Sequence, residues 1–284
     1  MTRTNNHSNI HKTMSSTCEG RLTLESGVPV STTNQTAKTT VYFTPYIGTN
    51  ISLYDSGDWD IFTFSELSLS ISGYTADTNY DIFIYNNSGT LTLQSVVWTD
   101  DTTRATDIIT LNGVYVLSGA TTRRYLGTIR TTATTGQCED SRERRFVWSY
   151  YNQVKKDQLT THVATAHTYS SSIWRATNND TTVGVKRYLL VLGLDTFVTV
   201  SVNNHSRYMY TAAALDGTTA SELYGGGGTN GLSGHNGDPS YNGQTFALFK
   251  DYVGTGYHFI QEMEYGINAS SIGFNSEIAG DHLC

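Results

Sequence analysis

The chain has 284 residues and a formal net charge of −7, and only 15% of its residues are charged. This length allows one large all-β domain or two domains of ordinary size. The negative charge argues against general nucleic-acid binding, and the sequence has neither an apolar run that could cross a bilayer nor a signal-peptide core. The 19 tyrosines, 26 glycines and abundant threonines favour strands joined by tight turns, so we predict an all-β fold.

Residues 1–17 contain almost no apolar side chains, and we predict a flexible N-terminal arm there. His7 and His11 have the spacing of a metal pair on a helix. Nothing near them favours a helix, so we predict no metal site in the arm.

Residues 18–120 are predicted to form a first β-sandwich domain. Leu67, Leu69 and Ile71 alternate with polar residues, which is the period of a strand with one solvated face. Turn signals such as Asn112-Gly113 recur about every ten residues, as sandwiches and barrels require.

Residues 121–158 are interpreted as a basic and aromatic connector. Residues 121–156 contain eight basic and three acidic side chains, so this segment carries +5 within a chain of −7. One interpretation is a solvated turn with local ion pairs. A second is a surface that pairs with an acidic neighbouring subunit or particle, and a third is contact with nucleic acid. The residues predicted for that interface are Arg123, Arg124, Arg142, Arg144, Arg145, Trp148 and Tyr150.

The segment 140–156 is compatible with one short helix or with a strand. A helix would place Phe146, Tyr150 and Val154 on one face, and a strand would align Phe146, Trp148 and Tyr150. The aromatic and β-branched content favours the strand.

Residues 159–284 are predicted to form a second, jelly-roll-like β-sandwich. Residues 183–192 and 197–202 resemble a hairpin around Gly193-Leu-Asp195. The Gly/Asn-rich segment 224–244 is predicted to be a long surface loop, and such loops on β scaffolds commonly bind partners. The candidate binding residues in it are Tyr224, Asn230, His235, Asn236, Asp238 and Tyr241.

No catalytic motif, cofactor motif or metal motif is present. Glu262, Glu264 and His258 would share a strand face, where they could bind a cation or act as acid and base, although a solvated or interface-lining face is the commoner arrangement. The three cysteines are widely spaced, without a C-x-x-C pair, and are predicted to be free thiols.

Several ordered blocks within residues 18–155 resemble a family of bacteriophage and prophage virion proteins, described as tail, fibre or head-decoration components. The blocks are GRLTLESGVPV (20–30), TVYFTPY (40–46), NYDIFIYNNSG (79–89), RRYLGTIRTT (123–132) and EDSRERRFVWSYYNQV (139–154). The resemblance implies a structural protein of the virion, made in the bacterial cytoplasm, with other virion proteins as partners. It transfers no catalytic residue.

The resulting expectation is a non-enzymatic fibre or tail protein that docks on the particle and presents a β domain to a host surface glycan. The alternative is a capsid decoration protein, of the cement or head-fibre type, that stabilises the shell. A glycan-degrading tail enzyme comes third. A homotrimer is expected because such proteins bury their sheet edges against copies of themselves. No cofactor, nucleic acid or membrane insertion is expected.

Overall fold

A computed structural model describes residues 15–162, 167–180, 187–207, 209–217, 243–266 and 272–284. Strands account for nearly all of its regular structure, beside the short 3₁₀ helix η1 (Thr177–Asn179). The predicted all-β fold is therefore confirmed. Residues 1–14 of the predicted arm and the predicted binding loop up to residue 242 lie outside the described residues.

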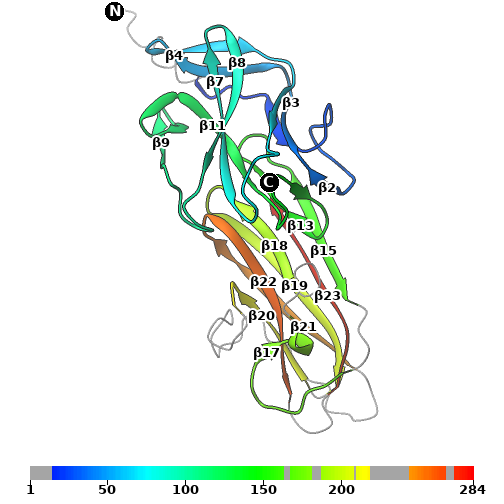
Figure 1. Cartoon of the computed structure of the whole chain (residues 1–284). Helices are drawn as coiled ribbons and strands as arrows, with labels where there is room; N and C mark the ends of the chain where they lie inside the picture. Colours follow the sequence, from blue (N-terminus) through cyan, green and yellow to red (C-terminus); the bar gives the residue numbers. More distant parts are fainter. Residues whose placement is uncertain (1–14, 163–166, 181–186, 208, 218–242, 267–271) are drawn as a thin grey trace, which may run out of the picture.

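The first unit contains two main sheets and a hairpin (Figure 1). One sheet has the order β1-β3-β6, and the other has the order β8-β7-β11-β10-β9, with β14 paired to β11. The bounds are β1 (Gly20–Thr23), β3 (Thr40–Pro45), β4 (Asn50–Asp55), β5 (Asp58–Thr63), β6 (Leu67–Ser70), β7 (Asn79–Asn87), β8 (Thr90–Val97), β9 (Ile108–Leu111), β10 (Val114–Leu117), β11 (Ala120–Arg130) and β14 (Val147–Ser149).

The hydrophobic pattern and turn chemistry of the sequence explain this unit. Val41, Phe43, Ile82 and Ile84 point into a shared core between its sheets. The predicted turn Asn112-Gly113 joins β9 to β10, and both residues have positive φ (52° and 85°), as a type I′ hairpin requires.

The segment after β11 forms strands and no helix, which agrees with the favoured interpretation. Its strands are β12 (Cys138–Asp140), β13 (Arg144–Arg145), β14 and β15 (Lys155–His162). Phe146, Val147 and Trp148 are all buried, so both faces of β14 are covered. β12 also pairs with β2 (Gln35–Lys38), and β13 pairs with β18 (Arg187–Leu192). One sheet thereby contains strands from the first unit, the connector and the second unit.

The second unit has the strand order of a jelly roll, as predicted. One of its sheets is β15-β23-β19-β21, and its other sheet joins β18 and β20 to the two sides of β22. The bounds are β16 (His167–Thr168), β17 (Arg175–Ala176), β19 (Thr196–Arg207), β20 (Met209–Leu215), β21 (Gly243–Val253), β22 (Gly256–Gly266) and β23 (Ile272–Leu283). Val198, Val200, Phe249 and Ile260 belong to the core of this unit.

The predicted hairpin around residues 193–195 is wrong. β18 pairs with β22, whereas β19 pairs with β21 and β23, so the chain crosses between sheets at this turn. Both strands are apolar enough to be buried, and β21, β22 and β23, which pair with them, lie far along the chain from this turn, where local pattern cannot indicate them.

Figure 1 shows the two units arranged end to end, with the C-terminus between them. The Arg21 guanidinium in β1 donates to the Cys284 carbonyl at 3.0 Å, which ties the C-terminal residue to the first unit.

Candidate binding surfaces

Arg124 of β11 is fully buried and holds the start of the described chain. Its guanidinium donates to the main-chain carbonyls of residues 15–17 and of Ser52, the last at 2.5 Å, and it lies over the Tyr151 ring. Such a cationic donor group satisfies several carbonyls that burial would otherwise leave unpaired. The expectation of an interface role for Arg124 is therefore corrected, because the side chain is used inside the chain.

The charges of the connector pair mainly with one another. Asp140 binds Arg145 at 3.0 Å and also binds Lys156, and Glu139 accepts from Arg144 at 2.8 Å. Asp140 and Arg145 are buried, so Arg145 is also unavailable to a partner. The local ion-pair interpretation fits this arrangement. Arg142 differs because it is exposed and lies at the rim of a surface hollow.

The aromatic residues of the connector have separate positions. Trp148 is buried, which corrects its predicted interface role, and it packs in the core of the second unit. Tyr150 is half-buried, with its ring centroid 5.3 Å from that of Tyr115. Arg123 is half-buried above the Tyr85 ring at 4.3 Å. The seven predicted interface residues therefore do not form one continuous exposed patch.

Arg104, which forms a buried ion pair within the first unit, also binds the second unit. The Arg104 guanidinium donates to both carboxylate oxygens of Asp81, at 2.6 and 3.3 Å, and to the Gly193 carbonyl of the second unit at 2.6 Å. Burial raises the pKa of Asp81, against the opposing effect of Arg104. A Cβ at Gly193 would overlap the Tyr125 hydroxyl and the Trp148 ring, so glycine permits this close approach.

A second contact between the units borders a hollow of about 560 Å³. The Arg130 guanidinium forms an ion pair with the Asp101 carboxylate at 2.6 Å. The same guanidinium lies 3.9 Å from the centroid of the Tyr257 ring. The Tyr257 main-chain N–H donates to the Asp101 carbonyl at 2.8 Å. Glu139 and Arg144 line the same hollow. Arg130, Glu139 and Arg144 are therefore already paired within the chain.

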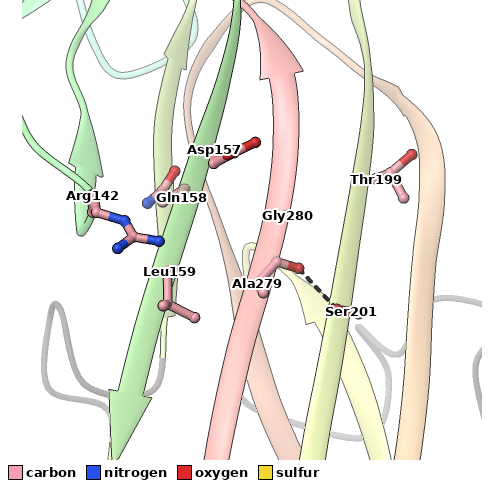
Figure 2. Close-up of a pocket in the computed structure, with 8 residues that line it drawn as sticks. All are labelled: Arg142, Asp157, Gln158, Leu159, Thr199, Ser201, Ala279 and Gly280. Carbon is pink, nitrogen blue, oxygen red and sulfur yellow. Dashed lines mark hydrogen bonds between the residues drawn. The ribbon is translucent and has the colours of Figure 1, made fainter. Parts of the chain in front are cut away.

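A shallower hollow of about 420 Å³ lies on the outer face of the jelly-roll sheet β15-β23-β19-β21 (Figure 2). Ala279 and Gly280 form its floor, and Leu159 and Ser201 lie on the strands at either side. The Ser201 hydroxyl donates to the Ala279 carbonyl at 3.1 Å. Small residues on the central strand therefore create the depression.

The same face carries exposed apolar side chains. Phe197 of β19 and Tyr252 of β21 are 45% and 70% exposed and pair across the strands, with their ring centroids 5.3 Å apart. Leu283 of β23 is 49% exposed. Large exposed apolar groups that cluster are typical of contact surfaces.

Glu264 forms a buried cluster within the jelly roll. Its carboxylate accepts from Arg175 at 2.8 Å and from the Asn178 N–H at 3.0 Å, and it lies 2.6 Å from His167 Nε2. This cluster holds the segment 167–180 against β22. Glu262, Glu264 and His258 are all buried, which argues against a solvated face. Among the residues described here, no group of three or more His, Cys, Asp or Glu side chains is arranged to hold a metal.

The three cysteines are free, as predicted, and all three are buried. Burial raises the pKa of Cys18 and Cys284 to about 11 and raises that of Cys138 as well. A thiol reacts as its thiolate, so these groups are inert at neutral pH.

We therefore expect a thiol reagent to modify native protein only slowly at pH 8, and to react with all three cysteines after denaturation. The native rate should rise as the pH approaches about 11, because the thiolate fraction then grows. The absorbance of the chromogenic thiol that the reagent releases gives the number of cysteines that have reacted. One cysteine reacting stoichiometrically within seconds in native protein would contradict the prediction.

The predicted loop residues Tyr224, Asn230, His235, Asn236, Asp238 and Tyr241 lie outside the described residues, so their role stays a prediction. Sequence reasoning missed the Asp81–Arg104 pair and the hollow on the outer face. Neither has a local signal, because their residues come together only through long-range strand pairing.

No family model matches this chain, and no curated protein matches it. Similar solved structures include the insecticidal delta-endotoxin Cry8Ea1 from Bacillus thuringiensis, at 9% identity and TM-score 0.25, covering 93% of this chain and 52% of that one. They also include BuGH86 in complex with neoagarooctaose, at 7% identity and TM-score 0.24, covering 88% of this chain and 34% of that one.

A structure of infectious bursal disease virus, Gx strain, is similar at 10% identity and TM-score 0.22, covering 89% of this chain and 72% of that one. The chain thus spans about half the length of the toxin and about a third of BuGH86. At these TM-scores no inference about function rests on any of them. Within the described residues, no helix has the length and apolar character to traverse a membrane.

Proposed function

We propose that this chain is a non-enzymatic structural protein of a bacteriophage virion, which docks on the particle at its N-terminal end and displays its jelly roll for host attachment. The resemblance over residues 18–155 supports the virion assignment. The jelly-roll topology supports display, because this sandwich presents loops at its ends and broad sheet faces at its sides.

The observation that carries the proposal is the placement of the two ends. The chain enters the first unit at residues 15–17, beneath Arg124, whereas the jelly roll extends away from that unit (Figure 1). This separation supports a protein that docks at one end and displays a domain at the other.

The contacts between the units support a projecting role as well. Arg104 and Arg130 each link the first unit to the second, and Gly193 packs directly against Tyr125. Such direct packing and charge-assisted bonding resist bending of one unit against the other. A displayed domain would then be held at a fixed distance from the particle.

The test is gold-labelled antibody against residues 160–284, imaged on intact virions by electron microscopy. Label confined to the tail or its tip supports the attachment role. Label over the whole head favours the decoration role, and capsid stability with and without the protein would then be measured. Absence of label from every particle overturns the virion premise, and glycan cleavage by the pure protein overturns the non-enzymatic assignment.

Deletion of residues 1–14 tests the docking end separately. Because the contacts of Arg124 begin at Ser15, we expect the truncated protein to keep its melting temperature within about 2 °C and to lose incorporation into particles. Quantitative blotting of purified virions measures incorporation. Normal incorporation of the truncated protein would contradict a docking role for this segment.

A further inference from the structure

The hollow of about 560 Å³ beside Arg130 lies where the first unit, the connector and the second unit meet. Its volume is within the range of small-molecule binding sites, which commonly lie between domains. Phe146 and Tyr257 supply an aromatic surface, and most of the other lining residues carry hydroxyl, amide, carboxylate or guanidinium groups. The hollow therefore combines an apolar surface with many hydrogen-bonding groups.

Arg130 directs hydrogen-bond donors into this hollow. The residue is only 5% exposed, and its guanidinium uses a single nitrogen, Nη1, to bind Asn79 at 2.9 Å and Asp101 at 2.6 Å. Among the described residues, neither Nε nor Nη2 of Arg130 has a hydrogen-bond partner, and both remain accessible. Because the residue is otherwise buried and lines the hollow, these two donors face into it.

The Arg130 guanidinium is also held in a fixed orientation. Besides its bonds to Asn79 and Asp101, it lies over the Tyr257 ring, with the guanidinium carbon 3.9 Å from the ring centroid. Donors that are fixed before a ligand arrives lose little conformational freedom on binding. The free edge of this guanidinium is therefore preorganised.

Arg144 provides a second free guanidinium edge. Its Nη1 donates to Glu139 at 2.8 Å, and Glu139 in turn accepts from the Ser141 hydroxyl at 2.6 Å. Within the described part of the chain, Nε and Nη2 of Arg144 have no partner, and both are accessible. Two arginines with unused parallel N–H groups thus line one hollow.

The charge balance indicates which kind of ligand fits. Arg130 and Arg144 are each paired with a carboxylate, and the exposed carboxylates of Asp77 and Glu143 also line the hollow. Four carboxylates against two guanidinium groups leave no excess positive charge to attract an anion. The hollow instead offers N–H donors, carboxylate acceptors and the Gln137 amide, which can do both.

A saccharide has the matching chemistry, because its hydroxyls both donate and accept and its C–H faces can pack against aromatic rings. We propose that this hollow binds a short neutral saccharide. The free edges of Arg130 and Arg144 donate to its hydroxyl oxygens, and Glu143 accepts from its hydroxyls. The inference does not rest on the proposed virion function, and it concerns a site other than the predicted loop 224–244.

Saturation-transfer NMR of the full chain is the first measurement. The probes are neutral methyl glycosides of glucose, galactose, mannose, rhamnose and N-acetylglucosamine, each at about 5 mM, and a glycan array extends the test to oligosaccharides. At least one neutral saccharide should bind, with a Kd that changes by about twofold or less between about 0.05 and 0.5 M NaCl. Binding of acidic glycans alone, or of no glycan in either experiment, overturns the proposal.

Conservative variants test the two guanidinium edges. Arg130→Lys and Arg144→Lys each keep a positive charge beside the carboxylate partner and remove the free edge. Each should raise the Kd about fivefold or more. Arg123→Lys makes the same change at a half-buried arginine outside the hollow and should leave the Kd within about twofold of wild type. An unchanged Kd in both hollow variants overturns the assignment.

A bulky substitution tests the hollow without altering a polar group. Ala133 is exposed and lines the hollow, so Ala133→Trp should fill the space and abolish detectable binding. Ala105→Trp places the same side chain at an exposed alanine elsewhere and should bind as wild type does. Circular dichroism spectra and melting curves establish that each variant is folded. A folded Ala133→Trp that binds with the wild-type Kd overturns the site, even where Arg130→Lys fails to fold.

Discussion

Replacing Arg124 with Met is expected to lower the free energy of unfolding by about 3–5 kcal/mol, because buried carbonyls that lose their donors are costly. Met preserves most of the side-chain volume and removes the guanidinium. The carbonyls of residues 15–17 and Ser52 then lose their shared donor, and Tyr151 loses its cationic partner. Equilibrium urea unfolding measures the change.

The neighbouring residue provides the matched control. Arg123 is half-buried over the Tyr85 ring and donates to the side chains of Gln94 and Thr122. Arg123→Met should therefore cost about 1 kcal/mol or less. Equal losses from the two variants would show that the carbonyl contacts of Arg124 contribute little.

Replacing Arg104 with Met should cost about 3–5 kcal/mol, because removal of one partner leaves Asp81 buried without its counter-charge. The same change removes the bond to the Gly193 carbonyl, so the two units should lose part of their mutual stabilisation. Scanning calorimetry should show a lower and broader transition.

Two comparisons test this explanation. Arg144→Met breaks a pair with Glu139 in which both side chains are more exposed than in the Arg104–Asp81 pair, so it should cost less than Arg104→Met. Adding Asp81→Asn to Arg104→Met should recover part of the loss, because the buried uncompensated charge disappears. Strictly additive losses in the double variant would contradict a coupled pair.

The all-β class and many of the turns followed from the sequence because they depend on local pattern. The alternation at Leu67 and Leu69 places their side chains on one face of β6, and the Asn112-Gly113 turn forms as its dipeptide predicts. The burial of the three cysteines and the strand character of residues 147–149 are also compatible with their apolar composition.

The sequence did not show which charged side chains are buried or what they contact. Arg123 and Arg124 are adjacent and identical, yet one is half-buried at an aromatic ring and the other is fully buried among carbonyls. Successive residues of a strand point to opposite faces, so their environments depend on what packs against each face. The sequence therefore showed that residues 142–145 are rich in arginine, but the prediction that Arg145 lies at an interface was wrong because its side chain is buried.

Amino-acid sequence by itself determined where strands form, which faces are apolar and where the chain turns, because these properties depend on neighbours within a few residues. Only the tertiary structure decided that β18 and β19 belong to different sheets, and that Asp81 meets Arg104. The physical reason is that strand pairing between distant segments sets these relations, and no local pattern encodes which distant strand supplies the partner.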